Sequence, residues 1–167
     1  SPSPRNQGEP EKEIGLVVET IRPTVSTDHL DELGQMELIG HGESNFAGSP
    51  PNRIHNIEVA MEKFKGVLLA PGEEFSFVDI LGPVDEETGY REELVIKQGE
   101  TIPEFGGGVC QVSTTVFRAA LNTGLKITER RNHAYPVQYY APQGTDATIY
   151  IPKPDFRFLN DTKNYVL

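Results

Sequence analysis

The residues of this chain best suited to covalent chemistry are its single cysteine and the three glycines before it. Gly106, Gly107 and Gly108 lead into Cys110, which opens a segment with the apolar spacing of an amphipathic helix. Unpaired backbone N–H groups and the positive end of the helix dipole favour thiolate over thiol, and the thiolate is the nucleophile. Glycine has no Cβ, so the backbone can adopt positive φ and a substrate can approach closely. We therefore predict a reactive thiol bordered by substrate-binding glycines.

A proton acceptor for this thiol is expected downstream. His133 is the nearest histidine after Cys110 and lies at the end of the strand predicted to follow the helix. Such a pair serves acyl transfer, in which the histidine takes the thiol proton and later returns one to the leaving amine. Either Asn132 or Asp146 could orient the imidazole, and the spacing does not choose between them. The alternative for His133 is a polar residue at a strand end.

Helix-start groups beside the cysteine are candidates for contacting substrate. The N–H groups of Cys110 and Gln111 could stabilise the oxyanion of a tetrahedral intermediate, and Gln111 could instead orient a substrate amide. Ser113 is a helix-start hydroxyl rather than a nucleophile, because no base is implied beside it. We include it among the candidate substrate contacts.

Two arginines and a tyrosine complete the candidate substrate-binding set. Arg130 and Arg131 could clamp a carboxylate, which would offset the repulsion between an acidic protein and an anionic polymer. Alternatively, the two arginines belong to a solvent-exposed face and bind no substrate. Tyr139 could line a groove, although aromatic residues in strands more often belong to the core.

Composition restricts the class of protein. The 167 residues and 37% hydrophobic content suit one globular domain with a filled core. The formal net charge of −10 argues against nucleic-acid binding, and no apolar run approaches the ~18 residues of a membrane span. One cysteine excludes an intrachain disulfide and multi-cysteine zinc patterns, so we expect neither a metal nor a cofactor. A lone cysteine is also commonly a buried hydrophobic residue, which leaves a non-catalytic binding module as the alternative.

Periodicity predicts an α+β domain in which two main helices pack on a mixed, largely antiparallel sheet. The two helices are expected at about 52–69 and 110–122, the second ended by Gly124 in the left-handed conformation. A short helix is expected up to residue 33. The predicted strands are 14–21, 36–39, 74–78, 94–96, 125–131, 137–140, 147–151 and 156–158.

Several separated motifs, found in the expected order, resemble the VanW family. They are Phe75-Ser76-Phe77, Leu81-Gly82-Pro83, Gly89-Tyr90, the block from Gly106 to Thr115, Glu129-Arg130 with His133, and Asp146-Ala147-Thr148. The similarity covers roughly residues 52–160. It implies an extension at 14–51 that carries the end of a peptidoglycan-binding-like module and a VanW-like domain at 52–167. Residues 1–13 are polar and Pro-rich without hydrophobic periodicity, which predicts a flexible linker or an artificial chain boundary.

The resemblance implies a role in the bacterial cell wall, since the family is named from glycopeptide-resistance gene clusters. Some members are understood to be L,D-transpeptidases that make 3-3 peptidoglycan crosslinks. Cys110 would then attack the third residue of a stem peptide and release the terminal D-amino acid, and the side-chain amine of a second stem would attack the thioester. His133 occupies the histidine position of the family.

The expected function is therefore that of a cysteine L,D-transpeptidase. Its partners would be peptidoglycan stem peptides at the cell surface, with no nucleic acid, and its parent chain would be a larger, membrane-anchored protein. The oligomeric state stays open. The alternatives are an L,D-carboxypeptidase and a non-catalytic cell-wall-binding or scaffolding module.

Overall fold

The computed structural model describes residues 37–97 and 100–167, which belong to one compact unit. The predictions for residues 1–13, 14–21 and 26–33 lie outside the described residues. In chain order the elements are α1 (Pro51–Phe64), β1 (Glu74–Ser76), α2 (Phe77–Leu81), β2 (Glu92–Lys97), β3 (Glu100–Phe105), α3 (Val109–Thr123), β4 (Lys126–Glu129), the 3₁₀-helix η2 (Gln138–Tyr140) and β5 (Arg157–Leu159).

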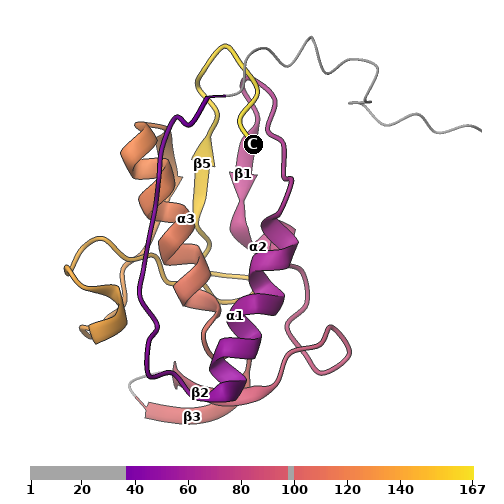
Figure 1. Ribbon diagram of the computed structural model, residues 1–167, viewed down its shortest axis with the longest axis vertical. Helices are drawn as coiled ribbons and strands as arrows, with labels where there is room; N and C mark the ends of the chain where they lie inside the picture. The colour runs from indigo at the N-terminus through magenta and orange to yellow at the C-terminus, as the bar shows by residue number, and fades with distance from the viewer. Residues whose placement is uncertain (1–36, 98–99) are drawn as a thin grey trace, which may run out of the picture. The chain divides into compact units, whose positions relative to one another are not determined.

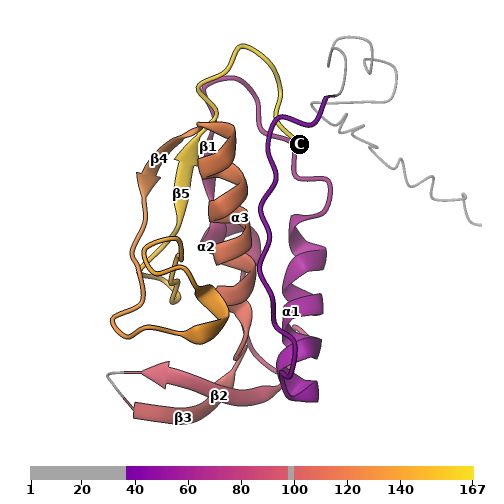
Figure 2. The same ribbon diagram turned by 60° about the vertical axis from the view of Figure 1, so that its left-hand side comes forward.

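The strands form two antiparallel sheets. One has the order β1-β5-β4, and the other is the hairpin β2-β3. Helices α1 and α3 lie side by side in front of the first sheet, and the hairpin lies beyond the end of both helices where α3 begins (Figure 1, Figure 2). The α+β class is confirmed, with two sheets in place of the single one expected.

Helix α3 has both boundaries set by glycine. At its end Gly124 has φ +80°, its N–H donates to the carbonyls of Ala120 and Leu121, and the N–H of Leu125 also donates to Ala120. This left-handed glycine stop is the arrangement predicted from the sequence. Its buried face includes Val112 and Ala120, which join the main core cluster. The helix therefore has a fixed rotation about its axis.

Helix α1 differs from its prediction in length and in the face it buries. It ends at Phe64 because Lys65 is extended, and Leu69 pairs instead with Val166 in an isolated bridge. Met61 is 49% exposed. The buried face carries two polar residues, Arg53 and Asn56. Hydrogen bonding, and not apolar character, accounts for their burial.

Residues 37–50, the strap, run along α3 without regular secondary structure (Figure 2). Gly42 permits this close approach, since a Cβ there would lie 2.3 Å from the carbonyl oxygen of Thr115. The hydroxyls of Ser44 and Thr115 are 2.6 Å apart, and Arg118 donates to the carbonyl of Glu43 at 2.8 Å. The strand expected at 36–39 is absent from residues 37–39; residue 36 lies outside the described range.

Four further expectations need correction. The strand predicted at 94–96 is the longer β2, and β3 was missed. Helix α2 was also missed; the Ser76 hydroxyl caps its start by accepting from the N–H of Asp79. Residues 138–140 form a 3₁₀-helix and no strand. Residues 147–151 are in no strand, because their backbone groups bond instead to side chains of α3 and to loop carbonyls.

Candidate active site

The glycine ribbon, residues 106–108 immediately before α3, packs against α1. Gly108 has φ +110°, and a Cβ there would lie 2.9 Å from Cγ of Arg53 and 3.0 Å from its carbonyl oxygen. The side-chain amide of Asn56 donates to the carbonyl of Gly107 at 3.1 Å. The first turn of α3, and with it Cys110, is therefore held in one position.

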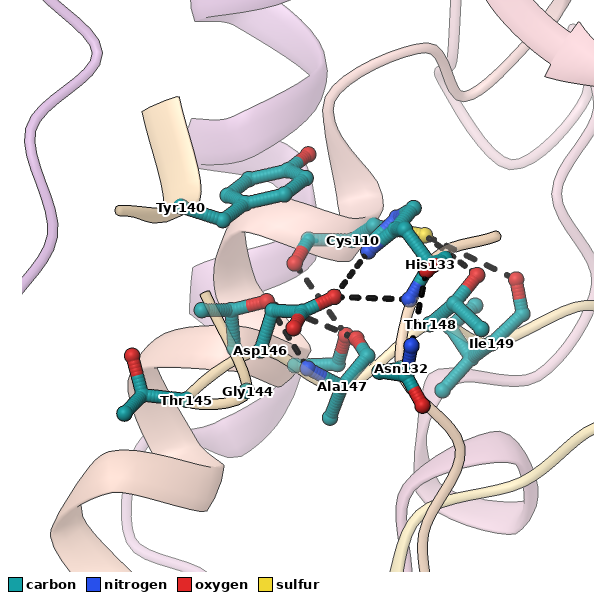
Figure 3. Close-up of polar contacts among 12 residues, drawn as sticks. Cys110, Asn132, His133, Tyr140, Gly144, Thr145, Asp146, Ala147, Thr148 and Ile149 are labelled. Carbon is teal, nitrogen blue, oxygen red and sulfur yellow. Dashed lines mark hydrogen bonds and ion pairs between the residues drawn. The ribbon is translucent and has the colours of Figure 1, made fainter. Parts of the chain in front are cut away.

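The sulfur of Cys110 is half-buried among polar groups. Its Sγ lies 3.6 Å from the carbonyl oxygen of Ile149 and 3.8 Å from Oγ1 of Thr148 (Figure 3), and the imidazole of His133 lies close enough to affect the charge of the thiol. Burial raises the pKa of the thiol, but the interaction with His133, together with smaller contributions from Ile149 and Thr148, outweighs burial, so the pKa lies below its ordinary value. The surroundings therefore favour the thiolate.

The imidazole of His133 is oriented by Asp146. Nδ1 lies 2.6 Å from Oδ2 of Asp146, and the same oxygen accepts from the backbone N–H of His133 at 2.7 Å. Because Nδ1 is engaged, Nε2 is the ring nitrogen left for the thiol. The ring of Tyr140 stacks on the imidazole with a centroid distance of 4.7 Å. These contacts fix the ring on both its edge and its face.

Each of Cys110, His133 and Asp146 shifts the pKa of a neighbour toward its charged form. Burial lowers the pKa of His133, but Cys110 and Asp146 raise it overall. Burial raises the pKa of Asp146, whereas the two bonds from His133 and the charge of Arg130 lower it overall. A lowered thiol pKa beside a raised imidazole pKa is the pattern of a thiolate–imidazolium pair.

Asn132 has a different position from Asp146. It is exposed, and its amide donates to the carbonyl of His133 at 2.8 Å. It therefore does not contact the imidazole ring through that amide. Of the two candidates that the sequence left open, the geometry brings Asp146 to the ring.

The side chain of Gln111 is buried and hydrogen-bonds within the protein. It is 1% exposed; Oε1 accepts from Arg53 at 2.8 Å, and Nε2 donates to the hydroxyl of Ser44 at 2.6 Å. Its backbone N–H donates to Gly108 at 2.8 Å, so the expectation of an oxyanion donor at this position is wrong. The N–H of Cys110 has no backbone acceptor within the described part of the chain.

Ser113 and two of the glycines also contact the protein itself. The Ser113 side chain is completely buried and donates to the carbonyl of Ala147 at 2.6 Å. Gly106 and Gly107 are buried, and a Cβ at Gly107 would lie 2.8 Å from Cβ of Glu93. The ribbon thus packs against its own chain where the sequence suggested room for a substrate.

The paired arginines have unequal roles. Arg130 donates to the carbonyls of Asp146 and Gly144 at 2.8 and 2.7 Å, and its guanidinium lies 4.9 Å from the ring centre of Phe117. It holds the loop that carries Asp146. Arg131 is exposed, and its carbonyl accepts from the N–H of Thr148 at 2.8 Å. Of the pair, Arg131 has the more accessible side chain.

Two hollows flank η2. The smaller, about 140 Å³, is lined by His133, Asp146 and Tyr140 among others, so it reaches the base of the site. The larger, about 930 Å³, lies between the strap and η2 and includes Tyr139 and Arg118. The guanidinium of Arg53 lies 4.3 Å from the ring centre of Tyr139, which is therefore part of a groove wall with one face covered.

Sequence reasoning missed the contributions of Arg53 and Thr148. Thr148 had a usable signal, since in an extended Asp146-Ala147-Thr148 segment the first and third side chains would lie on one side. Arg53 has no comparable signal, because it is one of several polar residues in α1. Tyr140, like Tyr139, was a possible groove residue, but it was placed in a strand, and its stacking on the imidazole was not foreseen.

No helix of the described residues is both long and apolar enough for a membrane span. Within residues 37–97 and 100–167, no three His, Cys, Asp or Glu side chains are grouped to hold a metal ion.

Comparisons with known proteins agree with the motifs. A family model described as VanW like protein matches residues 52–167. The chain is 35% identical over 147 residues to the uncharacterized protein YoaR of Bacillus subtilis, covering 88% of this chain and 48% of that protein. It is 34% identical over 116 residues to the vancomycin B-type resistance protein VanW of Enterococcus faecalis, covering 66% and 42%. The chain spans about half the length of these curated relatives. No solved structure matches it significantly.

Proposed function

The chain belongs to the VanW family, and from that premise we propose that it is a cysteine acyl transferase of the bacterial cell wall. The specific activity that we propose is an L,D-transpeptidase that forms 3-3 crosslinks through a thioester on Cys110. The observation that carries the proposal is the pairing of the Cys110 thiol with His133, whose ring is held by Asp146. A nucleophile, a base and an orienting group in this relation are the requirements of acyl transfer.

The chemistry can be written with these three side chains. The thiolate attacks the carbonyl carbon of the third stem residue, a C–S bond forms, and the carbonyl π pair moves to oxygen. When the intermediate collapses, the C–N bond breaks and the His133 imidazolium gives its proton to the departing amine. The amine of a second stem then attacks the thioester, loses a proton to His133 and expels the thiolate. The enzyme returns to its starting charge state.

The cell-wall assignment draws on the relative named for vancomycin resistance. That name concerns the Enterococcus protein, and its extension to this chain is part of the proposal. We propose an extracellular location at the wall, with stem peptides as partners. Acyl transfer of this kind needs a nucleophile and a base from the protein, so the proposal names no cofactor.

Product analysis tests the proposed reaction. The purified chain is incubated with disaccharide-tetrapeptide muropeptides, with and without a second stem as acceptor, and the products are identified by liquid chromatography and mass spectrometry. The proposal expects a crosslinked dimer joined through the third residue of each stem. A tripeptide product alone, formed equally with and without acceptor, would identify an L,D-carboxypeptidase. Unchanged muropeptides would favour a non-catalytic wall-binding module.

A further inference from the structure

We propose that Thr148 is a catalytic residue whose hydroxyl donates a hydrogen bond to the oxyanion formed when Cys110 attacks a carbonyl. The inference rests on the proposed function for its natural substrate. Its chemistry, however, applies to any acyl donor that reaches the sulfur, so the two can be tested separately.

The position of Thr148 follows from the short segment that also carries Asp146. Only Ala147 separates the two residues in the chain. Ala147 is completely buried, Asp146 contacts the imidazole, and the Thr148 hydroxyl contacts the sulfur (Figure 3). One short segment thus reaches both reacting partners.

This segment is fixed to α3 by hydroxyl groups. The carbonyl of Ala147 accepts from Ser113 at 2.6 Å and from Thr114 at 3.4 Å, and the N–H of Ala147 donates to Thr114 at 3.2 Å. The N–H of Thr148 donates to the backbone carbonyl of Arg131 at 2.8 Å. Because α3 also carries Cys110, the hydroxyl and the sulfur are held by the same helix. A fixed donor needs little reorganisation when charge develops.

The distance suits a donor to the oxyanion. Oγ1 of Thr148 lies 3.8 Å from Sγ, which is long for a strong bond to the sulfur itself. In the tetrahedral intermediate the oxyanion sits on the carbon bonded to Sγ, so a hydroxyl on that side comes within roughly 3 Å of it, the reach expected of an oxyanion donor. The hydrogen bond therefore strengthens as the reaction proceeds.

The helix start alone does not supply two hydrogen-bond donors for the oxyanion. The N–H of Gln111 is bonded to Gly108, which leaves the N–H of Cys110 as the backbone donor at the helix start. A tetrahedral oxyanion is usually met by more than one donor. The Thr148 hydroxyl supplies the second.

The test compares Thr148→Val, which keeps the shape but removes the hydroxyl, with Thr148→Ser, which keeps the hydroxyl. Acylation is measured with p-nitrophenyl acetate and with tetrapeptide muropeptides. Alkylation by iodoacetamide is measured above the thiol pKa of each variant, where the sulfur is fully ionised. Alkylation passes through no oxyanion, so it reports the position and accessibility of the sulfur.

The valine variant should lose about 100-fold in acylation by p-nitrophenyl acetate, the usual effect of removing one oxyanion donor. The serine variant should recover most of that loss, and alkylation of the valine variant should match the wild type. Equal acylation in the valine variant and the wild type would overturn the inference. An equal fall in alkylation and acylation would do so too, because it would show a displaced sulfur.

Failure of the proposed function has a different signature. A wild-type protein that the ester acylates but muropeptides do not would overturn the assignment to stem peptides, and the ester data alone would decide the role of Thr148. A folded wild-type protein that neither donor acylates would overturn both.

Discussion

Replacement of Asp146 by asparagine tests the orienting role of this carboxylate. Oδ2 of Asp146 accepts from both Nδ1 and the backbone N–H of His133, at 2.6 and 2.7 Å. Asparagine keeps one carbonyl oxygen but brings an NH₂ group in place of the second oxygen, and it carries no charge. The imidazolium therefore loses its charged partner while the local shape is nearly preserved.

The magnitude follows from the charge lost. Both contacts with His133 go to one oxygen, so an asparagine carbonyl oxygen in that place keeps both as neutral hydrogen bonds. A hydrogen bond to a charged group exceeds a neutral one by about 1–1.5 kcal/mol. If that difference is lost from the transition state, acylation slows by about 5- to 13-fold. The pKa of His133 should fall and the pKa of the Cys110 thiol should rise, because the carboxylate contributes to the raised imidazole pKa.

The assay is single-turnover acylation by p-nitrophenyl acetate, with the fold of each variant checked by circular dichroism and thermal unfolding. Asn132→Ala is the matched control, because the Asn132 amide bonds to the backbone of His133 and leaves the ring alone. Its rate should stay within about twofold of the wild type, as expected for an exposed substitution. Asp146→Asn acting at the wild-type rate, or Asn132→Ala losing as much, would refute the reasoning.

Two other predictions follow from the same geometry. The rate of Cys110 alkylation should rise with pH through an inflection below ~8.5, the pKa of a free thiol, because His133 lowers the thiol pKa. His133→Ala removes the largest effect that opposes burial and leaves only the contributions of Ile149 and Thr148, so the inflection should move up; an unmoved inflection would contradict the ion pair. Gly108→Ala should lower the free energy of unfolding, measured in urea, by about 1–3 kcal/mol from its positive φ, and further through the contact with Arg53. Gly144 has φ +84° and open space around it, so Gly144→Ala should show only the loss that comes from the positive φ. Equal losses of unfolding free energy in the two variants would rule out a role for the contact between Gly108 and Arg53.

The parts of the fold that local sequence controls were predictable. The helix that begins near Cys110 and the stop at Gly124 depend on apolar spacing and a glycine cap, both visible in the chain. The strands near 125–131 and 156–158 were located for the same reason. The sequence also placed Cys110, His133 and Asp146 among its few candidates for one site.

Long-range polar contacts account for what was missed. Arg53 and Asn56 are buried because they bond to Gln111 and to the backbone of the glycine ribbon, which apolar periodicity cannot indicate. Residues 147–151 alternate like a strand, yet hydroxyls of α3 take their hydrogen bonds. The choice between Asn132 and Asp146 likewise needed the path of the loop that returns to His133.

The most direct test of the central claim is the intact mass of the protein during a single turnover with tetrapeptide muropeptide, quenched in acid. The thioester mechanism predicts an added mass equal to the donor without its terminal D-amino acid. Peptide mapping should place it on Cys110, and it should be absent from Cys110→Ala. A folded wild-type protein with no adduct, or crosslinked product formed by the alanine variant, would contradict the assignment of Cys110 as the nucleophile.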